Sequence, residues 1–309
     1  MPSRAAILAV ALLVSGEACA TYSISACDTD GACGVAVATN NLAVGATVPF
    51  ARAKVGAGAT QFETNPAHAI RGLALLAKGL TPARALARVL AEDGNFGGLG
   101  VDFRQTALVG MRGEAAEFTG REALAATWAG GRHGEHYAVI GNGLAGEEVL
   151  AAMESTFRNS QGALDARLLA ALEAGQAAGG QSIGAMSAVL LVRTPAGGFA
   201  DTDLRVDAAR EPVQELRQLF NLRQAHAAML DAERAAREGR RNDALACLDE
   251  AMLLGNAWDR IARRGARLAL MLGDRERASR LFARFAELNP KWASIDRSDD
   301  FYAPLFESK

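Results

Sequence analysis

The sequence predicts a layered α+β domain followed by a small all-helical region. Between residue 21 and about residue 207, short β-like runs and amphipathic helices come in blocks, which is typical of sheets covered by helices. From about Pro212 to the end, Arg, Ala, Leu and Glu recur at helical spacing. The chain has 309 residues, of which 50% are hydrophobic and 22% charged, so it is long and apolar enough to bury a core.

The charge balance excludes two classes of partner. There are 33 Lys and Arg residues against 35 Asp and Glu residues, a formal net charge of -2, and no run of five like charges. We therefore expect neither a nucleic-acid binder nor a polybasic membrane clamp. The main apolar run, Ala5 to Val14, is shorter than the roughly 20 residues that a bilayer span needs, so no transmembrane segment is expected.

That apolar run has the layout of a secretory signal. Arg4 precedes it, and Ala18-Cys19-Ala20 places small residues at positions -3 and -1 of a cleavage site. Residues 1–20 are then a signal peptide, and the mature protein starts at Thr21 and is periplasmic or secreted. Two alternatives remain open: a lipoprotein lipidated at Cys19, although Gly16 stands where an apolar residue is needed, and a buried N-terminal helix.

The first domain, residues 21–211, is expected to open with a β-hairpin. Residues 21–26 and 33–39 read as strands around Asp28-Thr29-Asp30-Gly31, whose glycine supplies the positive φ that a hairpin turn needs. A third strand is expected at 54–60, and two helices begin at Pro66 and at Pro82, the latter capped by Thr81. Further strands are predicted at 98–103, 107–111, 137–140 and 188–193, and further helices at 147–157 and 164–176.

Cys27 and Cys33 flank the turn of this hairpin. Export would place them in a compartment where disulfides persist, and a hairpin could bring the two residues face to face. We predict a disulfide between them. The alternative, that they are two small strand residues, has equal weight at this point.

The second domain, residues 212–309, contains an internal repeat. Five positions recur after 34 residues: Gly239, Ala244, Leu248, Ala251 and Leu254 reappear as Gly273, Ala278, Phe282, Phe285 and Leu288. The pattern resembles a tetratricopeptide repeat over about one and a half units, with a generic helical hairpin as the alternative. We expect Leu248, Ala251, Phe282 and Phe285 to pack into one seam.

Two glycine-rich motifs allow more than one reading. Residues 141–146 fit G-x-G-x-x-G and lie between a strand and a helix, as in a dinucleotide-binding site. Such a site also needs an acidic residue about 20 positions on, at the end of a second parallel strand. The candidate, Asp165, lies in a segment that is predicted to be helical. Residues 180–184 fit G-x-S-x-G with the flanking elements in reversed order for a nucleophile elbow. A Gly-rich turn is the simpler reading of both.

Thr21 carries the strongest chemical signal. Cleavage after Ala20 would give this residue a hydroxyl and a free α-amine, whose pKa of about 7.7 to 8.0 lets it accept the hydroxyl proton near neutral pH. This is the threonine form of an N-terminal nucleophile, which needs no separate histidine. The alternative is that Thr21 is merely a good small residue after a signal site.

The segments after Thr21 resemble the domain-of-unknown-function 1028 family. The matching segments run in order from Thr21 to about Leu219 and include Thr21-Tyr22-Ser23-Ile24-Ser25-Ala26, Gly34-Val35-Ala36-Val37-Ala38-Thr39, Val48-Pro49-Phe50-Ala51-Arg52-Ala53, Thr64-Asn65-Pro66, Phe118-Thr119-Gly120, Gly141-Asn142 and Asp203-Leu204-Arg205-Val206-Asp207. The resemblance implies a fold like that of the N-terminal-nucleophile (Ntn) hydrolases, a four-layer αββα sandwich. Some relatives carry a helical C-terminal extension described as peptidoglycan-binding, which the tail resembles.

The resemblance implies a set of site residues and an activity. Thr21 is the expected nucleophile, and Lys54 is a further catalytic candidate because proteasome-like members of the wider superfamily place a lysine near the nucleophile. From the glycine-rich turn itself, we expect the Asn142 side chain or nearby backbone N–H groups to stabilise the oxyanion. The candidate substrate-binding residues are Ser23, Arg52, Gln61, Asn65 and Gly143.

The expected protein is thus an exported Ntn-type amidohydrolase acting on a small amide or cell-wall peptide, without cofactor or metal. A homo-oligomer is compatible with the sequence. The alternative from another class is a non-catalytic envelope-binding protein, in which the Ntn-like domain is a scaffold and the tail contacts peptidoglycan or a partner protein.

Overall fold

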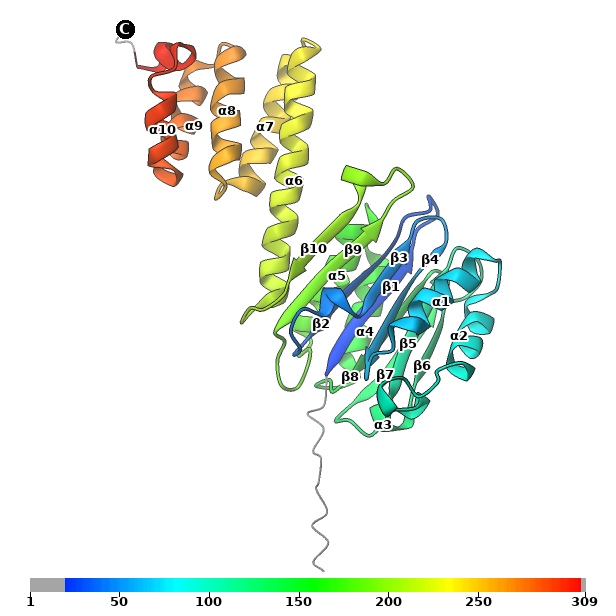
Figure 1. Cartoon of the computed structure of the whole chain (residues 1–309). Coiled ribbons are helices and arrows are strands. Elements are labelled where there is room, and N and C mark those ends of the chain that lie inside the picture. The colour runs from blue at the N-terminus through cyan, green and yellow to red at the C-terminus, as the bar shows by residue number, and fades with distance from the viewer. Residues whose placement is uncertain (1–19, 307–309) are drawn as a thin grey trace, which may run out of the picture. The chain divides into compact units, whose positions relative to one another are not determined.

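The computed structural model describes residues 20–306 and divides the chain into two compact units, one ending at Leu216 and the other starting at Arg217. The predicted signal peptide lies, apart from Ala20, outside the described residues. The first unit is a mixed α/β unit with antiparallel sheets, and the second is helical (Figure 1). Each unit is described by itself below.

The first unit contains two sheets. Its strands are β1 (Thr21–Cys27), β2 (Cys33–Thr39), β3 (Pro49–Arg52), β4 (Gly56–Phe62), β5 (Arg104–Gly110), β6 (Ala116–Thr119), β7 (Ala129–Gly134), β8 (Tyr137–Asn142), β9 (Ser187–Arg193) and β10 (Thr202–Val206). Sheet A has the order β10-β9-β2-β1-β8-β7 and sheet B the order β3-β4-β5-β6. Every pairing between these strands is antiparallel.

The helices of this unit are α1 (Pro66–Ala77), α2 (Pro82–Ala91), α3 (Arg121–Leu124), α4 (Glu148–Asn159) and α5 (Leu164–Ala177). Helices α4 and α5 pack on sheet A, where the Tyr22 hydroxyl donates a hydrogen bond to Gln176 of α5 at 2.6 Å. Helices α1 and α2 pack on sheet B, where Gly72 of α1 lies so close to Leu108 that a Cβ would come within 2.6 Å of it. The other faces of the two sheets meet each other.

Strand β1 shows how the alternation of side chains builds these contacts. All seven of its residues are buried. Tyr22 reaches toward α5, whereas Ser23 donates a hydrogen bond to Gln61 of sheet B at 2.7 Å, so successive residues face the helices and the other sheet. The space between the sheets is apolar at one end, around Val35, Val37 and Ile140, and polar at the end where β1 begins.

The β1–β2 hairpin is closed at its turn by a disulfide. Cys27 and Cys33 are paired residues of the two strands, with Cα atoms 4.1 Å apart. Asp28 accepts a hydrogen bond from the Ala32 N–H, and Gly31 has φ +94°, as the sequence of the turn requires. The disulfide lies at the far end of β1 from Thr21.

Two predicted strands differ from the structure. Residues 98–103 form short 3₁₀ turns (Phe96–Gly98 and Val101–Phe103), because Gly97 and Gly98 adopt positive φ. The strand expected at 54–60 begins only at Gly56, because Lys54 has φ +61° and belongs to the turn between β3 and β4.

The C-terminal unit is helical throughout its described part. Its helices are α6 (Pro212–Arg237), which starts in the first unit, α7 (Arg241–Gly255), α8 (Asp259–Met271), α9 (Arg275–Leu288) and α10 (Pro290–Asp296). The two repeat glycines, Gly239 and Gly273, have φ +74° and +76°, so they end their helices in the same way. The four residues expected in one seam are all buried but split: Leu248 and Ala251 pack in one cluster, Phe282 and Phe285 in a neighbouring one.

No helix among the described residues is long and apolar enough to cross a membrane.

Candidate functional site

Thr21 is the first residue of β1, which lies between β2 and β8 inside sheet A. In the strand register it is paired with Thr39 on β2 and with Asn142 on β8, and Ser187 on β9 follows Thr39 in the same row. Cross-strand partners project from the same face of a sheet, so these four side chains gather at the polar end of the space between the sheets. Thr21 is only 3% exposed.

The Thr39 hydroxyl holds Thr21 in place. Its oxygen lies 3.0 Å from the Thr21 hydroxyl oxygen, donates to the Ala20 carbonyl at 2.8 Å and accepts from the Asn41 N–H at 3.3 Å. A hydroxyl has one proton and two lone pairs. Since Thr39 gives its proton to Ala20, the proton between the two threonines comes from Thr21.

Two glutamines extend the site into sheet B. The Gln105 amide nitrogen donates to the carbonyls of Gly141 at 2.8 Å and Gly130 at 3.1 Å, which fixes the orientation of its amide. Its oxygen therefore accepts, from Gln61 at 2.8 Å and from Asn142 at 2.8 Å. We call Ser23, Gln61, Gln105 and Asn142 the glutamine network.

The glutamine network reaches Thr21 through its main chain. The Gln61 amide nitrogen lies 3.2 Å from the Thr21 carbonyl oxygen, to which it donates. Asn142 is fully buried. The hydrogen bond from its nitrogen to Gln105 fixes the orientation of its amide, and in this orientation its Oδ1 has no hydrogen-bond partner. A buried acceptor without a partner costs about 1 to 3 kcal/mol, so this atom, beside Thr21, is available to a donor that joins the site.

Gly143 borders the site directly after Asn142. It has φ +60°, and a Cβ placed on it would lie 2.5 Å from the Ala20 Cβ. Its carbonyl accepts hydrogen bonds from the N–H and the hydroxyl of Ser182, both at 3.1 Å. The two glycine-rich motifs thus meet here, as the turn after β8 and the loop before β9.

Neither motif has the surroundings of its usual function. The described strands of sheet A pair only in antiparallel fashion, so residues 141–146 lack the parallel strand of a dinucleotide fold. Ser182 follows α5 and precedes β9, the reverse of a nucleophile elbow. Gln181, next to it, is 4% exposed, and neither polar atom of its side chain has a partner.

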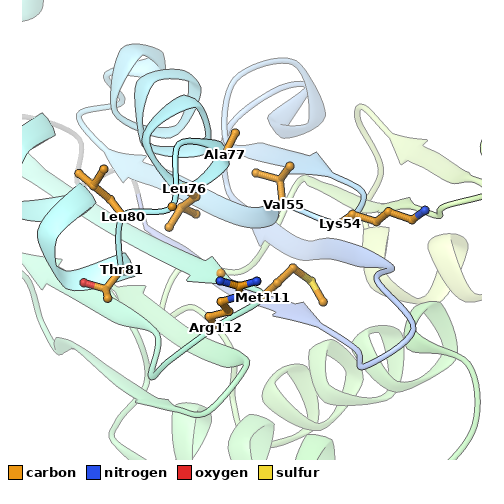
Figure 2. A pocket seen from close by; sticks show the side chains of 10 residues that line it. Lys54, Val55, Leu76, Ala77, Leu80, Thr81, Met111 and Arg112 are labelled. Atoms are coloured by element: carbon orange, nitrogen blue, oxygen red, sulfur yellow. The ribbon is translucent and has the colours of Figure 1, made fainter.

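Lys54 and Arg52 lie away from Thr21. Arg52 pairs with Gly56, the opposite end of β4 from Gln61, and five strand residues span about 17 Å. Lys54 donates its main-chain N–H to Gly31 of the hairpin turn. It lines a pocket of about 370 Å³ together with Leu76 and Arg112, from which its side chain extends outward (Figure 2). The structure therefore does not support either residue as part of a site at Thr21.

Asn65 also lies apart, on the other face of sheet B. Its main-chain carbonyl accepts a hydrogen bond from Thr60, the neighbour of Gln61, and its side chain caps α1 by accepting from the Ala67 N–H at 3.1 Å. Its nitrogen donates to Asp93 at 3.0 Å. Asn65 is thus a structural residue of the α1 face and does not contact Thr21.

Asp93 is the centre of a buried charged group, which we call the Asp93 cluster. Its Oδ1 lies 2.9 Å from the Arg104 Nε and 2.8 Å from the His68 Nε2, while the His68 Nδ1 contacts Thr106 at 3.1 Å. Arg104, only 1% exposed, also donates to the carbonyls of Glu63, Phe96 and Leu99. The cluster consists of Asn65, His68, Asp93, Arg104 and Thr106.

The pKa values in this cluster follow from burial and pairing. Burial raises the pKa of Asp93, but the hydrogen bonds from Arg104 and Asn65 and the nearby positive charge outweigh it, and the net pKa is below the ordinary value. Burial lowers the pKa of His68, the charges of Arg104 and Arg71 lower it further, and together they outweigh the effect of Asp93, so His68 is neutral near pH 7. Asp93 and Arg104 thus form a closed ion pair with a neutral histidine beside it.

The structure brings together most of the residues predicted for the site: Thr21, Ser23, Gln61, Asn142 and Gly143. Sequence reasoning missed Thr39 and Gln105. A threonine at the end of a buried strand and a glutamine inside one were their only signals. Among residues 20–306, no group of three or more His, Cys, Asp or Glu is placed to hold a metal ion.

Comparison with known proteins identifies the first unit. The chain is similar to the crystal structure of protein SPO2555 from Silicibacter pomeroyi, which carries the DUF1028 family model, with 32% identity and a TM-score of 0.58 over 65% of this chain and 84% of that chain. No curated protein matches. The model of a family of unknown function, DUF1028, matches residues 21–216, and thus starts at Thr21. The chain belongs to the DUF1028 family.

Proposed function

We propose that the protein is an exported amidohydrolase of the N-terminal-nucleophile type, in which removal of the residues before Thr21 creates the active enzyme. The observation that carries the proposal is the position of Thr21. It is the first residue of both the family match and β1, and its hydroxyl is buried and hydrogen-bonded at the head of the strand. The paired sheets, with helices packed on each, support the αββα fold of this class.

The proposed reaction uses only Thr21 for covalent chemistry. The free amine accepts the hydroxyl proton, Oγ1 attacks the amide carbonyl, and the carbonyl π electrons move to its oxygen. On collapse the C–N bond breaks, and the amine passes the proton to the leaving nitrogen. Water then attacks the ester by the same route, which releases a carboxylic acid and restores Thr21.

Asn142 fits a different role from the oxyanion donor expected from the glycine-rich turn. One N–H of its amide is held by Gln105, and the atom without a partner is an acceptor. An acceptor binds a positively polarised N–H and repels an oxyanion. We therefore assign Asn142 to position the Thr21 amine or the N–H of the substrate amide. Ser23 and Gln61 act through the main chain, by fixing the Thr21 carbonyl.

A second candidate function concerns the helical unit. A pocket of about 400 Å³ between α6 and α8 is lined by Arg237, Arg264 and Arg267, by Leu268 and Met271, and by Glu233, which pairs with Arg264 at 2.8 Å. The two arginines that do not pair with Glu233, together with the apolar side chains, suit an acidic envelope component, such as a cell-wall peptide, or an acidic segment of a partner protein. The two proposals are compatible, since each uses a separate unit.

The test of the enzymatic proposal is a comparison of Thr21 variants in the exported protein. The intact mass of the mature chain should correspond to Thr21 as the first residue. On a panel of amides and cell-wall peptides, Thr21→Ala should lose at least about 1000-fold in kcat/KM, and Thr21→Ser should retain part of the activity. A mature chain that begins elsewhere, or equal turnover by Thr21→Ala, contradicts the mechanism.

A further inference from the structure

Ala20 fills the space beside the proposed nucleophile. It is 1% exposed; its carbonyl accepts the Thr39 hydroxyl proton at 2.8 Å, and its methyl group faces Gly143. A Cβ on Gly143 would be only 2.5 Å from that methyl carbon, so the main chain of Gly143 itself forms the wall. Thr39 and Gly143 therefore hold the two ends of one small acyl group, its oxygen and its alkyl part.

This acyl group occupies nearly the position that a reaction intermediate would need. Before processing, Ala20 is an acyl group bound to the nitrogen of Thr21. In the covalent intermediate, the acyl group of the substrate is bound to Oγ1 of the same residue. A carbonyl carbon that bridged both atoms would close a five-membered ring with the nitrogen, Cα, Cβ and Oγ1, so the two positions are neighbours. The two acyl groups therefore lie close together and share the same walls.

We infer that the space left by Ala20 after processing is the acyl subsite of the enzyme, and that it takes an acyl group with a side chain no larger than methyl, such as alanyl or acetyl. The inference rests on the proposed function. Loss of Ala20 frees the Thr39 hydroxyl proton, which is then donated to the substrate carbonyl oxygen. Thr39 becomes a donor to the developing oxyanion, and Gly143 sets the size limit.

The first experiment measures acyl-group preference. Mature protein that starts at Thr21, verified by intact mass, is assayed on glycyl, alanyl, valyl and phenylalanyl anilides. We expect kcat/KM to fall at least about 10-fold from alanyl to valyl and further to phenylalanyl, because added methylenes meet the Gly143 main chain. A valyl or phenylalanyl substrate that reacts as fast as alanyl overturns the inference and leaves the proposed function standing.

A measurement that does not depend on the anilide substrates distinguishes failure of the acyl-subsite inference from failure of the proposed function. Incubation with the activated ester p-nitrophenyl acetate, followed by an acid quench, should place one hydroxylamine-labile acetyl ester on Thr21 of the mature protein and no such ester on Thr21→Ala, whose α-amine can carry only a hydroxylamine-stable amide, as detected by peptide mass spectrometry. If neither this adduct nor hydrolysis of any anilide occurs, the proposed function itself fails, and the acyl subsite with it.

The second experiment changes the wall of the subsite. Gly143→Ala adds a methyl group where Ala20 was and should lower the ratio of alanyl to glycyl hydrolysis at least about 10-fold. Gly198→Ala is the control: its φ of +59° is nearly that of Gly143, but a Cβ there has no neighbour within 4 Å. An unchanged ratio in Gly143→Ala overturns the inference, and because it is a ratio, loss of folded protein does not move it.

The third experiment tests the Thr39 hydroxyl. Thr39→Val keeps the shape of the side chain without the donor and should lower kcat about 100-fold, with a smaller change in KM. Thr39→Ser should restore most of kcat. Equal kcat in Thr39→Val and the unmodified enzyme excludes Thr39 as the donor to the carbonyl oxygen.

Discussion

The two faces of sheet B carry two buried polar groups that differ in kind. The glutamine network faces sheet A, is uncharged and leaves the Asn142 Oδ1 without a partner. The Asp93 cluster faces α1, contains an ion pair, and joins Asp93 to Arg104, Asn65 and His68. The two groups meet on β5, where Gln105 of the glutamine network lies between Arg104 and Thr106 of the Asp93 cluster.

This difference in charge and in hydrogen-bond pairing indicates a structural role for the Asp93 cluster and a functional role for the glutamine network. A buried charge is tolerated only when it is fully paired. Arg104 donates to Asp93, to the carbonyl of Glu63 after β4, and to the carbonyls of Phe96 and Leu99 in the segment before β5. A neutral network with an open acceptor has room for one more donor. We expect the Asp93 cluster to determine stability and the glutamine network to determine activity.

The largest effect on stability is expected from Arg104→Met. This change leaves Asp93 as an uncompensated buried charge and should lower the free energy of unfolding by about 3 to 5 kcal/mol, measured by urea denaturation. Arg88→Met is the control, because Arg88 is exposed and its pair with Glu92 contributes little. Equal stabilities of the two variants would show that the Asp93 cluster is not structural.

A smaller loss of stability and a larger loss of activity are expected from Gln105→Met. The substitution removes the acceptor of Gln61 and Asn142 and should cost about 1 to 3 kcal/mol in the free energy of unfolding. Because Asn142 would no longer be held beside Thr21, kcat should fall by a larger factor than the folded fraction does. Activity that merely follows the folded fraction would assign the glutamine network to structure as well.

The smallest effect is expected from the titration of His68. Its pKa is lowered in the folded protein, chiefly by burial, so the unfolded chain binds the extra proton first and stability falls as the pH drops below about 6.5. His68→Gln should make this loss between pH 6.5 and 5 smaller, as measured by urea unfolding at each pH. The pKa of His226 is also lowered and its contribution remains, so the variant must be compared with the parent. Identical slopes would contradict the burial of a neutral His68.

The elements that sequence reasoning located are those with a long local pattern. The hairpin from Thr21 to Thr39 has a seven-residue strand on each side of a turn that ends in Gly31, and Pro82 after Thr81 starts α2 as capping chemistry requires. Strands β3 and β6 have four residues each, too few for an alternation to be recognised. Residues 98–103 contain apolar residues at strand-like spacing, but two glycines with positive φ break the strand.

Strand pairing, and not closeness along the chain, determines which residues form the site: Thr39, which was missed, lies in the same hairpin as Thr21, whereas Asn142, which was predicted, lies on the distant strand β8. Gln105 reaches Gln61 across 44 positions of sequence through the pairing of β4 with β5, which no local pattern encodes. Lys54 is closer in sequence to Gln61 than Gln105 is, yet β4 carries it to the opposite end of the sheet. Distance along the chain was therefore a poor guide to the members of the site.

The pairing of Thr21 with strands on both sides has a practical consequence. Chain ends usually fray, but a terminus at Thr21 would begin inside a three-strand ladder and keep its amine in a defined position. The same confinement makes the site intolerant of leftover residues. On the proposed mechanism, a purification tag or a single residue left upstream of Thr21 would turn the amine into an amide and occupy the acyl subsite. Protein prepared in that form would be inert, so assays should use material whose first residue has been verified.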